Sequence, residues 1–334
     1  MVRAYLLRLL TDADDLTNRE YLAGWAVAIA ALGILPLFLT TYWVKIFILA
    51  NVFALFTISW NVVSGRTDYI SFGHSFLIGA AGYATAILTT ASGLPLVVAL
   101  PLSILFALFA GVLIFIPSLK LRGAYFTFVT LMIPILAERL VIRQSDLTGG
   151  VRGIIGIPNL SGDLLVNYYL SMGLMLAAGL TLWILFRSDL GTILRMIRES
   201  EDLVENSGIN PLKFKITIFM LSAIIAGVGG AFKVTYLGSI TIDSVLYLTL
   251  SINIVIAAII GGRGSVAGAV GGAYFFVLYE AYMRTFLGSP TRHLLFFLLG
   301  IVFVSLFPEG VVPRAIKYLR DRSDETGTGD ESPA

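Results

Sequence analysis

The stretch SINIVIAAIIGGRGSVAGAVGGAYFFVLYE, Ser251 to Glu280, joins two apolar runs through a short connection that contains glycine. Gly264, Gly268 and Gly272 are spaced four residues apart, which makes a doubled GxxxG pattern. Hydrocarbon provides no hydrophobic force between apolar helices, and glycine at this spacing favours their association because two backbones can approach closely. The pattern therefore predicts helix packing at these three glycines. A pore lining, where glycine leaves room for a solute, is the alternative.

The composition shows that the whole chain shares this apolar character. Its 334 residues are 57% hydrophobic and 13% charged, whereas a soluble domain is typically about half apolar and about a quarter charged. Repeated apolar runs of about 20 residues indicate membrane-spanning helices. The absence of cysteine excludes disulfides and cysteine-ligated metals, and the two histidines argue against a histidine-rich metal site. We therefore expect an all-α, polytopic integral membrane protein.

Ten apolar segments predict about ten transmembrane helices. Eight or nine spans with a re-entrant piece near 66–80 are the alternative. The connections are short, except for residues 143–163 and 187–215. The ten segments are 21–40, 44–63, 70–90, 95–117, 124–142, 164–186, 216–237, 245–261, 265–283 and 293–307.

The distribution of Lys and Arg predicts the orientation, because these residues concentrate in short cytoplasmic loops. If the N-terminal tail, 1–20, is cytoplasmic and the segments alternate, 16 of the 23 basic residues fall on that side. The even number of segments places the C-terminal tail, 309–334, on the same side, and its polar end is expected to be disordered. We therefore expect a transmembrane domain over 21–308 in the cell membrane, with both termini cytoplasmic.

The longest internal cytoplasmic loop in this topology is RSDLGTILRMIRESEDLVENSGINPLKFK, residues 187–215, here called the coupling segment. It holds five basic and five acidic residues in 29 positions, and its apolar residues recur at helical spacing. The letters SDL offer a helix N-cap, and SGINP ends the helix at Gly208, with Pro211 beyond it. This amphipathic helix favours docking to a partner. A helix lying on lipid headgroups is the alternative, which the near balance of acid and base weakens.

A second run punctuated by glycine, NVVSGRTDYISFGHSFLIGAAGYATA, covers Asn61 to Ala86. Helix breaks at membrane depth are tolerated where the backbone lines a cavity or packs within protein. A broken helix in this run is therefore a candidate wall of a permeation path. An ordinary helix start, with Ser71 as its cap and His74 as a hydrogen-bonded core residue, is the alternative.

Ionisable residues inside the expected spans are functional hypotheses by default, because burying a charge in a membrane is costly. Lys233, Asp243 and Glu280 belong to this group. Glu280 and Arg284 lie four residues apart and are expected to pair along one helix. For each of these residues a structural role near a helix end competes with a role in transport.

Short signatures spread over residues 51–312 occur in an order that is typical of one protein family. They include SFGHSFLIGAAGYATA, AYFTFVTL, LTGGVRGIIGIP, RESEDLVENSGINPLKFK, IIGGRGSVAGAVGGA and SLFPEGVV. Taken together, they resemble the permease subunits of the high-affinity branched-chain amino acid importers, a family within the ATP-binding-cassette (ABC) transporters. The set in this order is specific, although no single piece of it would be.

The resemblance implies that the chain is a membrane-spanning permease and not an enzyme. In this family the cytoplasmic segment is a coupling helix that sits in a cleft of an ATPase subunit. The chain has no nucleotide-binding motif, so we expect ATP to be bound by partner subunits and no cofactor to be bound here. The implied partners are two ABC ATPases, a second homologous permease or a second copy of this chain, an extracytoplasmic binding protein and lipid, without nucleic acid. The expected coupling residues are Arg195, Arg198, Glu199, Glu201, Gly208, Ile209 and Asn210.

The resemblance also implies a translocation path, which we expect along the segments at 70–90, 124–142 and 245–261. A largely apolar path with a few polar groups suits a small aliphatic zwitterion such as a branched-chain amino acid. The binding protein is expected to dock around 143–163. The candidate path residues, which offer hydrogen bonds, are Asn61, Ser71, His74, Thr130 and Asn253.

Some residues depart from the family pattern and leave alternatives open. Arg263 also occurs in the urea and short-amide branch of the family, which makes urea or a short amide the alternative substrate. Leu203 and Val204 replace small residues, and Asp68 stands where glycine is common, which indicates a divergent partner or substrate. An ion-coupled secondary transporter is a further alternative, but it would need a coupling-ion site and inverted repeats, and the sequence has no clear repeat.

Overall fold

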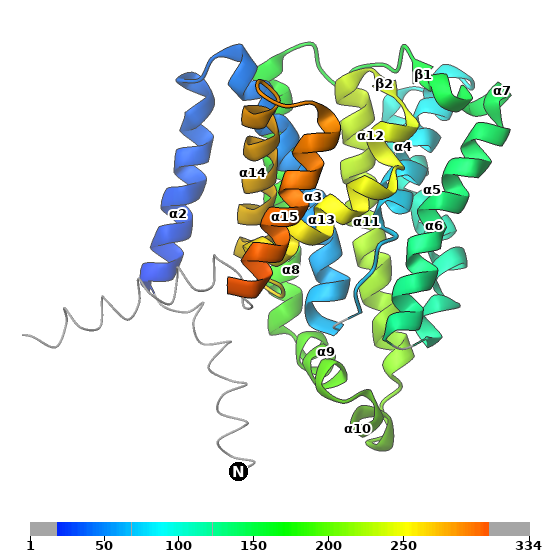
Figure 1. Cartoon of the computed structure of the whole chain (residues 1–334), viewed down its shortest axis with the longest axis vertical. Coiled ribbons are helices and arrows are strands. Elements are labelled where there is room, and N and C mark those ends of the chain that lie inside the picture. The colour runs from blue at the N-terminus through cyan, green and yellow to red at the C-terminus, as the bar shows by residue number, and fades with distance from the viewer. Residues whose placement is uncertain (1–18, 68, 122, 307–334) are drawn as a thin grey trace, which may run out of the picture.

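The computed structural model describes residues 19–67, 69–121 and 123–306. It is a bundle of helices that run roughly along one direction (Figure 1). The predicted C-terminal tail and all but the last two residues of the N-terminal tail lie outside the described residues. The longer helices are α2 (Arg19–Ile34), α3 (Thr41–Thr67), α4 (His74–Thr90), α5 (Leu96–Phe115), α6 (Ala124–Arg143), α8 (Leu164–Arg187), α9 (Asp189–Glu199), α11 (Pro211–Leu237), α13 (Leu248–Gly261), α14 (Val266–Met283) and α15 (Ser289–Leu306).

The remaining elements are short. Two strands, β1 (Ile154–Ile155) and β2 (Ser239–Ile240), pair antiparallel and form the only sheet within the described residues. The short helices are α7 (Ser145–Thr148), α10 (Glu201–Asn206) and α12 (Ile242–Val245), with 3₁₀ turns η1 (Leu35–Leu37), η2 (Ser118–Lys120) and η3 (Gly150–Arg152).

Each of the ten predicted segments contains a helix, and the predicted all-α class is confirmed. Seven helical stretches of the described chain are long and apolar enough to cross a membrane. Two shorter apolar helices, Val27–Leu37 and Pro290–Phe303, fall below that length. The number of spans therefore stays a prediction.

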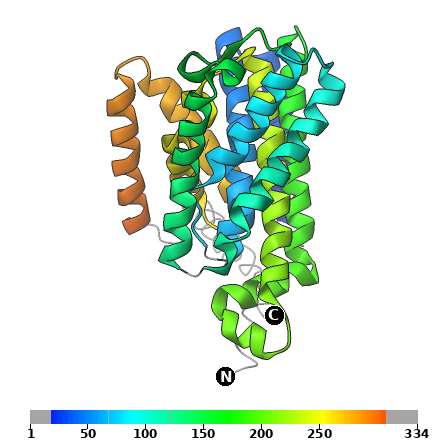
Figure 2. The same cartoon turned by 90° about the vertical axis from the view of Figure 1, so that its right-hand side faces the viewer.

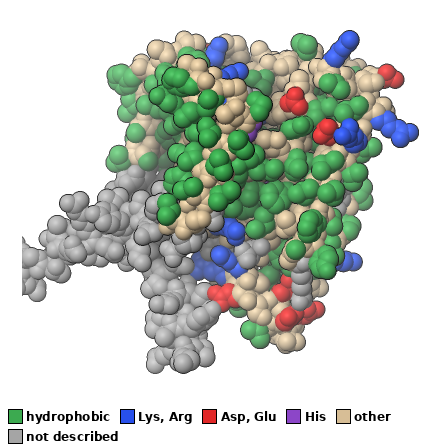
Figure 3. Space-filling view, in the orientation of Figure 1, with side chains coloured by type: hydrophobic (Ala, Val, Ile, Leu, Met, Phe, Trp, Pro, Cys, Tyr) green, Lys and Arg blue, Asp and Glu red, His purple; other side chains and the backbone are tan. Residues whose placement is uncertain are grey.

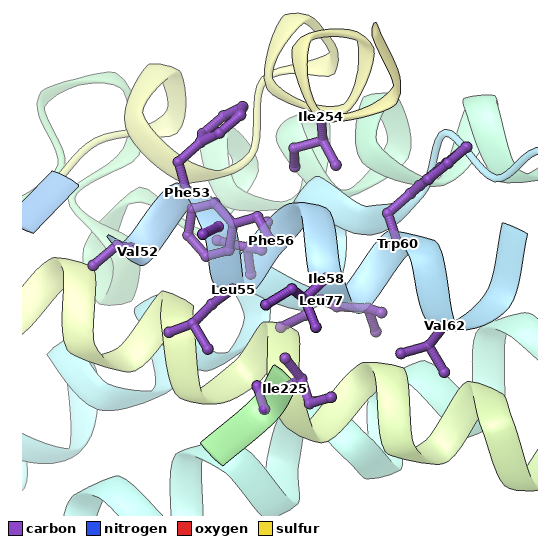
Figure 4. Close-up of a cluster of buried hydrophobic side chains, with 14 of the residues drawn as sticks. Val52, Phe53, Leu55, Phe56, Ile58, Trp60, Val62, Leu77, Ile225 and Ile254 are labelled. Carbon is purple, nitrogen blue, oxygen red and sulfur yellow. The ribbon is translucent and has the colours of Figure 1, made fainter. Parts of the chain in front are cut away.

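The helix α3 lies at the centre of the bundle and is buried on nearly every side. It packs against α8, α11, α13 and α14. Figure 4 shows side chains of α3 pointing toward Leu77 of α4, Ile225 of α11 and Ile254 of α13. Because these helices surround it, the run from Thr41 onward forms the core of the bundle.

Buried polar side chains of α3 fasten it to three neighbouring helices. The amide of Asn51 donates to the Ser171 hydroxyl of α8 at 3.0 Å and accepts a hydrogen bond from Tyr274 of α14. The hydroxyl of Ser59 donates to the carbonyl of Ser222 of α11 at 3.0 Å. Because buried polar groups without partners are costly, these bonds fix the register of α3 against its neighbours.

Residues 69–73, here called the interior segment, run between α3 and α4 without helical structure. Ser71 and Gly73 are nevertheless buried. The predicted segment at 70–90 is therefore helical only from His74, and the cap position is Gly73, not Ser71. A second break separates α12 from α13 at residues 246–247. Helical breaks that pack within protein are compatible with membrane depth.

The ends of the bundle differ in character. The helices α9 and α10 protrude at one end, where the described chain also begins and ends (Figures 1 and 2). The strands and α7 lie at the other end. Figure 3 shows a broad band of hydrophobic side chains between two regions where charged side chains gather. This arrangement is typical of a helical bundle that spans a membrane.

The contact between α13 and α14 depends on glycine. A Cβ atom at Gly272 would lie 1.9 Å from the Ala257 carbonyl oxygen, and one at Gly268 would lie 2.6 Å from the carbonyl oxygen of Gly262. Gly264 was expected on the same face, but it lies in the connection before α14. Its φ of +76° takes it out of the helical conformation, and its N–H donates to Asn61 of α3 at 2.8 Å.

Replacing Gly272 with alanine is expected to destabilise the protein by about 1–3 kcal/mol, because α14 must move away from α13 to admit the methyl group. The thermal unfolding of the detergent-purified protein measures this loss. Gly173→Ala in α8 is the matched control, since no atom lies within 4 Å of its added Cβ. An equal loss of stability in both variants would contradict the assigned contact.

Candidate functional site

The coupling segment folds into two helices where the sequence predicted one. They are α9 and α10, and they are separated by Ser200, whose backbone is extended with φ −161° and ψ 105°. The Ser200 side chain caps α10 by accepting the Leu203 N–H. Gly208 follows α10 with a φ of +81°, and the Asn210 side chain caps α11. The segment is therefore a bent unit with defined ends.

One face of this unit is anchored in the bundle and the other is exposed. Leu194, Ile197 and Val204 are buried, and α9 packs against α3, α8 and α11. Leu203 points outward and is 68% exposed. The outer face of the unit is therefore accessible at a protruding end of the bundle.

A cluster of three polar side chains, here called the buried cluster, links the coupling segment to the bundle: Lys215 is buried, and Tyr69 and Glu201 are half-buried. The ammonium of Lys215, whose side chain is 3% exposed, lies 2.6 Å from the carboxylate of Glu201. The Tyr69 hydroxyl donates to the other Glu201 oxygen at 2.6 Å and accepts from Lys215 at 2.8 Å. The Lys215 nitrogen also lies 4.3 Å from the centre of the Tyr69 ring. This triangle joins α10, α11 and the first residue of the interior segment.

The other expected coupling residues occupy different positions around the same unit. The guanidinium of Arg198 donates to the Gly65 carbonyl near the end of α3 at 3.3 Å. Glu199, Gly208 and Asn210 are exposed, and Arg195 and Ile209 are half-buried. Arg198 and Glu201 therefore face the bundle, while Glu199, Gly208 and Asn210 face outward. Contact with an ATPase stays a prediction for all seven residues.

The interior segment is held by side chains of α3 and α6. The indole of Trp60 donates to the Ser71 carbonyl at 2.8 Å, and the hydroxyl of Thr127 donates to the Ile70 carbonyl at 3.0 Å. The N–H of Ser71 donates to Ser64, and that of Phe72 donates to Thr130, each at 3.3 Å. These bonds replace the ladder that a helix would supply.

Four of the five candidate path residues form hydrogen bonds within the bundle. Thr130 accepts the Phe72 N–H, and Ser71 accepts the Gly73 N–H at 3.3 Å. Asn61 bridges α3 to the connection before α14, and His74 lies 3.0 Å from the Ser222 hydroxyl of α11. Ser71 and Thr130 thus hold the interior segment, while Asn61 and His74 join α3 and α4 to other elements, and contact of the four with a solute stays a prediction.

Asn253, the fifth candidate, lines a cavity of about 820 Å³ whose walls come from α3, α11, α12, α13, α14 and α15. Its side chain is 4% exposed, and its Oδ1 has no partner among the described residues. The five candidates thus divide into four that secure the interior and one that faces a cavity.

Two members of the buried cluster were not singled out from the sequence. Lys215 was counted only as a basic residue of a cytoplasmic loop, although its place just before an apolar run was a signal of burial. Tyr69 carried no such signal, because its bond to Glu201 joins positions 132 residues apart. Glu280 pairs with Arg292 of α15 at 2.8 Å, a partner that the sequence did not indicate; Arg284 was the one expected.

An apolar helical bundle with interior helix breaks and a charged pair of helices at one end defines a multi-pass membrane protein. Residues 42–306 match the family described as "Branched-chain amino acid transport system / permease component". The high-affinity branched-chain amino acid transport system permease protein LivM of Salmonella typhimurium (strain LT2) is 25% identical, over 95% of this chain and 80% of its own length. LivM of Escherichia coli (strain K12) is 26% identical, over 93% and 79%. No solved structure matches the chain.

The chain therefore belongs to this family of ABC permease components, and the resemblance found in the sequence is confirmed. It is a multi-pass membrane transport subunit. The match covers α3 to the end of α15, so it includes the coupling segment, the interior segment and the cavity.

The buried cluster makes a prediction about stability. Replacing Lys215 with methionine leaves the Glu201 carboxylate, 18% exposed, without its ammonium partner. Breaking one side of a buried pair typically costs about 3–5 kcal/mol, so we expect a clear fall in the unfolding temperature of the purified protein. The double substitution Glu201→Gln with Lys215→Met is expected to recover part of the loss.

Lys213→Met is the matched control for this experiment. Lys213 lies two residues earlier on α11 and is exposed, and its replacement is expected to leave the unfolding temperature nearly unchanged. Similar effects at the two lysines would show that Lys215 does not depend on the buried pair.

Proposed function

We propose that the chain forms the translocation path of an ABC importer for a branched-chain amino acid. An extracytoplasmic binding protein delivers the solute, and separate ATPase subunits supply the energy. The observation that carries the proposal is the bent coupling segment, whose outer face is exposed and whose inner face is bonded to the interior segment. Family membership and the names of the relatives support the substrate class.

The mechanism follows the bonds of the buried cluster. Closure of the ATPases moves α9 and α10, and Glu201 passes this motion to Tyr69 at the start of the interior segment. Because residues 70–72 are held by side chains of α3 and α6, a shift at Tyr69 changes how α4 packs against both helices. The interior segment is therefore the element that converts motion outside the membrane into rearrangement within it.

The remaining partners follow from the two ends of the bundle. The end with α9 and α10 faces the cytoplasm, and both chain termini lie on that side. Residues 143–163, with α7 and β1, face the opposite side and receive the binding protein. A second permease, either a homologue or a second copy of this chain, completes the path. The ATPases bind the ATP, and this chain carries no cofactor.

Urea or a short amide is the second candidate substrate, because Arg263 fits that branch of the family. Arg263 lies in the connection before α14, next to Gly264. This connection passes close to Gly65 of α3, because a Cβ atom added at Gly65 would lie 2.8 Å from the backbone nitrogen of Gly264. That position is near the coupling end of α3 and far along the helix from the cavity lined by Leu49 and Phe56.

The substrate is tested by ATP-dependent uptake into proteoliposomes that contain this chain with its genomically neighbouring permease, ATPases and binding protein. Labelled leucine and labelled urea are compared side by side. We expect leucine to accumulate only with ATP and urea to stay at the level of empty liposomes. Uptake of urea alone would move the protein to the urea branch, and uptake without ATP would indicate a secondary transporter.

The docking role of the coupling segment is tested by Leu203→Glu. Burying a new carboxylate in a protein interface is costly, so we expect at least about a tenfold loss of ATPase copurifying with the permease. Leu147→Glu is the control, because Leu147 is also exposed, at 54%, but lies in α7 at the other end of the bundle. If Leu203→Glu retained the ATPase as well as Leu147→Glu does, α10 would not be the docking surface.

A further inference from the structure

The cavity of about 820 Å³ lies in the half of the bundle that is farther from the coupling segment. Leu49 and Val52 belong to the first half of α3, while Lys233 belongs to the last turns of α11 and Glu280 to the last turn of α14. Its volume falls in the range of small-molecule sites, about 300–1,000 Å³. Most of its wall is apolar, with aromatic rings from α3, α14 and α15.

Two buried oxygen atoms of the lining residues lack a hydrogen-bond partner among the described residues. They are Oδ1 of Asn253 on α13 and Oε2 of Glu280 on α14. Buried acceptors without partners are costly, so a ligand that donates hydrogen bonds would be stabilised in this cavity. The other oxygen of Glu280 is held by Arg292 at 2.8 Å, which fixes the carboxylate in place. Asp243 also lines the cavity but is exposed to solvent.

Lys233 supplies the opposite charge. Its ammonium donates to the Ser244 carbonyl at 2.5 Å and lies 5.8 Å from the centre of the Phe56 ring. An ammonium group has three donors, so the bond to Ser244 leaves two for an anion. The cavity therefore offers a fixed cation, a fixed anion and an apolar wall.

We propose that this cavity is the permease's own substrate site and that it recognises both charged ends of an aliphatic amino acid. Lys233 binds the α-carboxylate, Glu280 and Asn253 bind the α-ammonium, and the side chain packs between Phe53, Phe56 and Phe276. Urea has no charge to pair with Lys233 or Glu280, and a simple carboxylic acid leaves the Glu280 oxygen unpaired. The inference rests on the proposed function and adds the residues that discriminate the substrate.

The absence of cysteine from the chain allows a direct test. Val277→Cys places the chain's only thiol in the cavity wall, and its modification by a small methanethiosulfonate reagent is followed by the mass of this chain within the assembled transporter. We expect millimolar leucine to slow the labelling several-fold. Urea and 4-methylpentanoate, which has leucine's carbon skeleton without the ammonium, are expected to have little effect.

Two further variants test whether leucine slows the labelling by binding in the cavity. Ser92 is exposed on the connection between α4 and α5, and leucine is expected to leave the labelling rate of Ser92→Cys unchanged. Adding Glu280→Gln to Val277→Cys is expected to abolish the protection by leucine. Protection by urea or 4-methylpentanoate equal to that by leucine would overturn the assignment of the charged groups.

Uptake of leucine by the same preparations separates this inference from the proposed function. We expect Lys233→Met and Glu280→Gln to lower uptake by about tenfold or more, while stimulation of the ATPase by the binding protein persists. Lys45→Met on α3 and Glu138→Gln on α6, neither of which lines the cavity, are expected to transport normally. Leucine uptake without any protection of Val277→Cys would overturn the site alone, whereas absence of uptake by the unsubstituted complex would overturn both proposals.

Discussion

A membrane offers no water to backbone groups that a helix leaves unpaired, and this constraint governs the interior segment. The backbone between α3 and α4 leaves the helical conformation while Ser71 and Gly73 are buried. Its carbonyls and N–H groups are served by Trp60, Ser64, Thr127 and Thr130. The break is therefore stabilised by the side chains that α3 and α6 bring to it.

The coupling segment, which protrudes from the bundle, is connected to the interior segment by side chains. Tyr69 begins the interior segment and bonds to Glu201 of α10, and Lys215 of α11 neutralises that carboxylate. A buried ion pair contributes little net stability, but it is costly to break, so it keeps one geometry. A rigid link of this kind between the coupling segment and a helix break is what the proposed mechanism requires.

The sequence predicted helix existence well and helix breaks poorly. All ten apolar segments contain helices, because hydrophobic length is a local property of the chain. A break within residues 61–86 was one of two predicted alternatives, but the start of α4 at His74, the division of the coupling segment at Ser200 and the break before α13 were not located. The break before α4 is stabilised from elsewhere in the chain, since Trp60 of α3 donates to the Ser71 carbonyl, whereas Ser200 caps α10 with its own side chain. The path candidates show the same limit: polar residues were found, but not which of them face a cavity.

The sequence by itself determined the all-α membrane class, the place of the coupling segment and the family, because hydrophobicity, charge and short signatures are read in order along the chain. Only the tertiary structure decided the partners: Lys215 with Glu201, Glu280 with Arg292, and Gly272 with the backbone of α13. It also decided that Lys233, Asn253 and Glu280 share one cavity. Helices that are apolar on all sides carry no mark of which face meets which neighbour, so packing alone settles where their few polar groups meet.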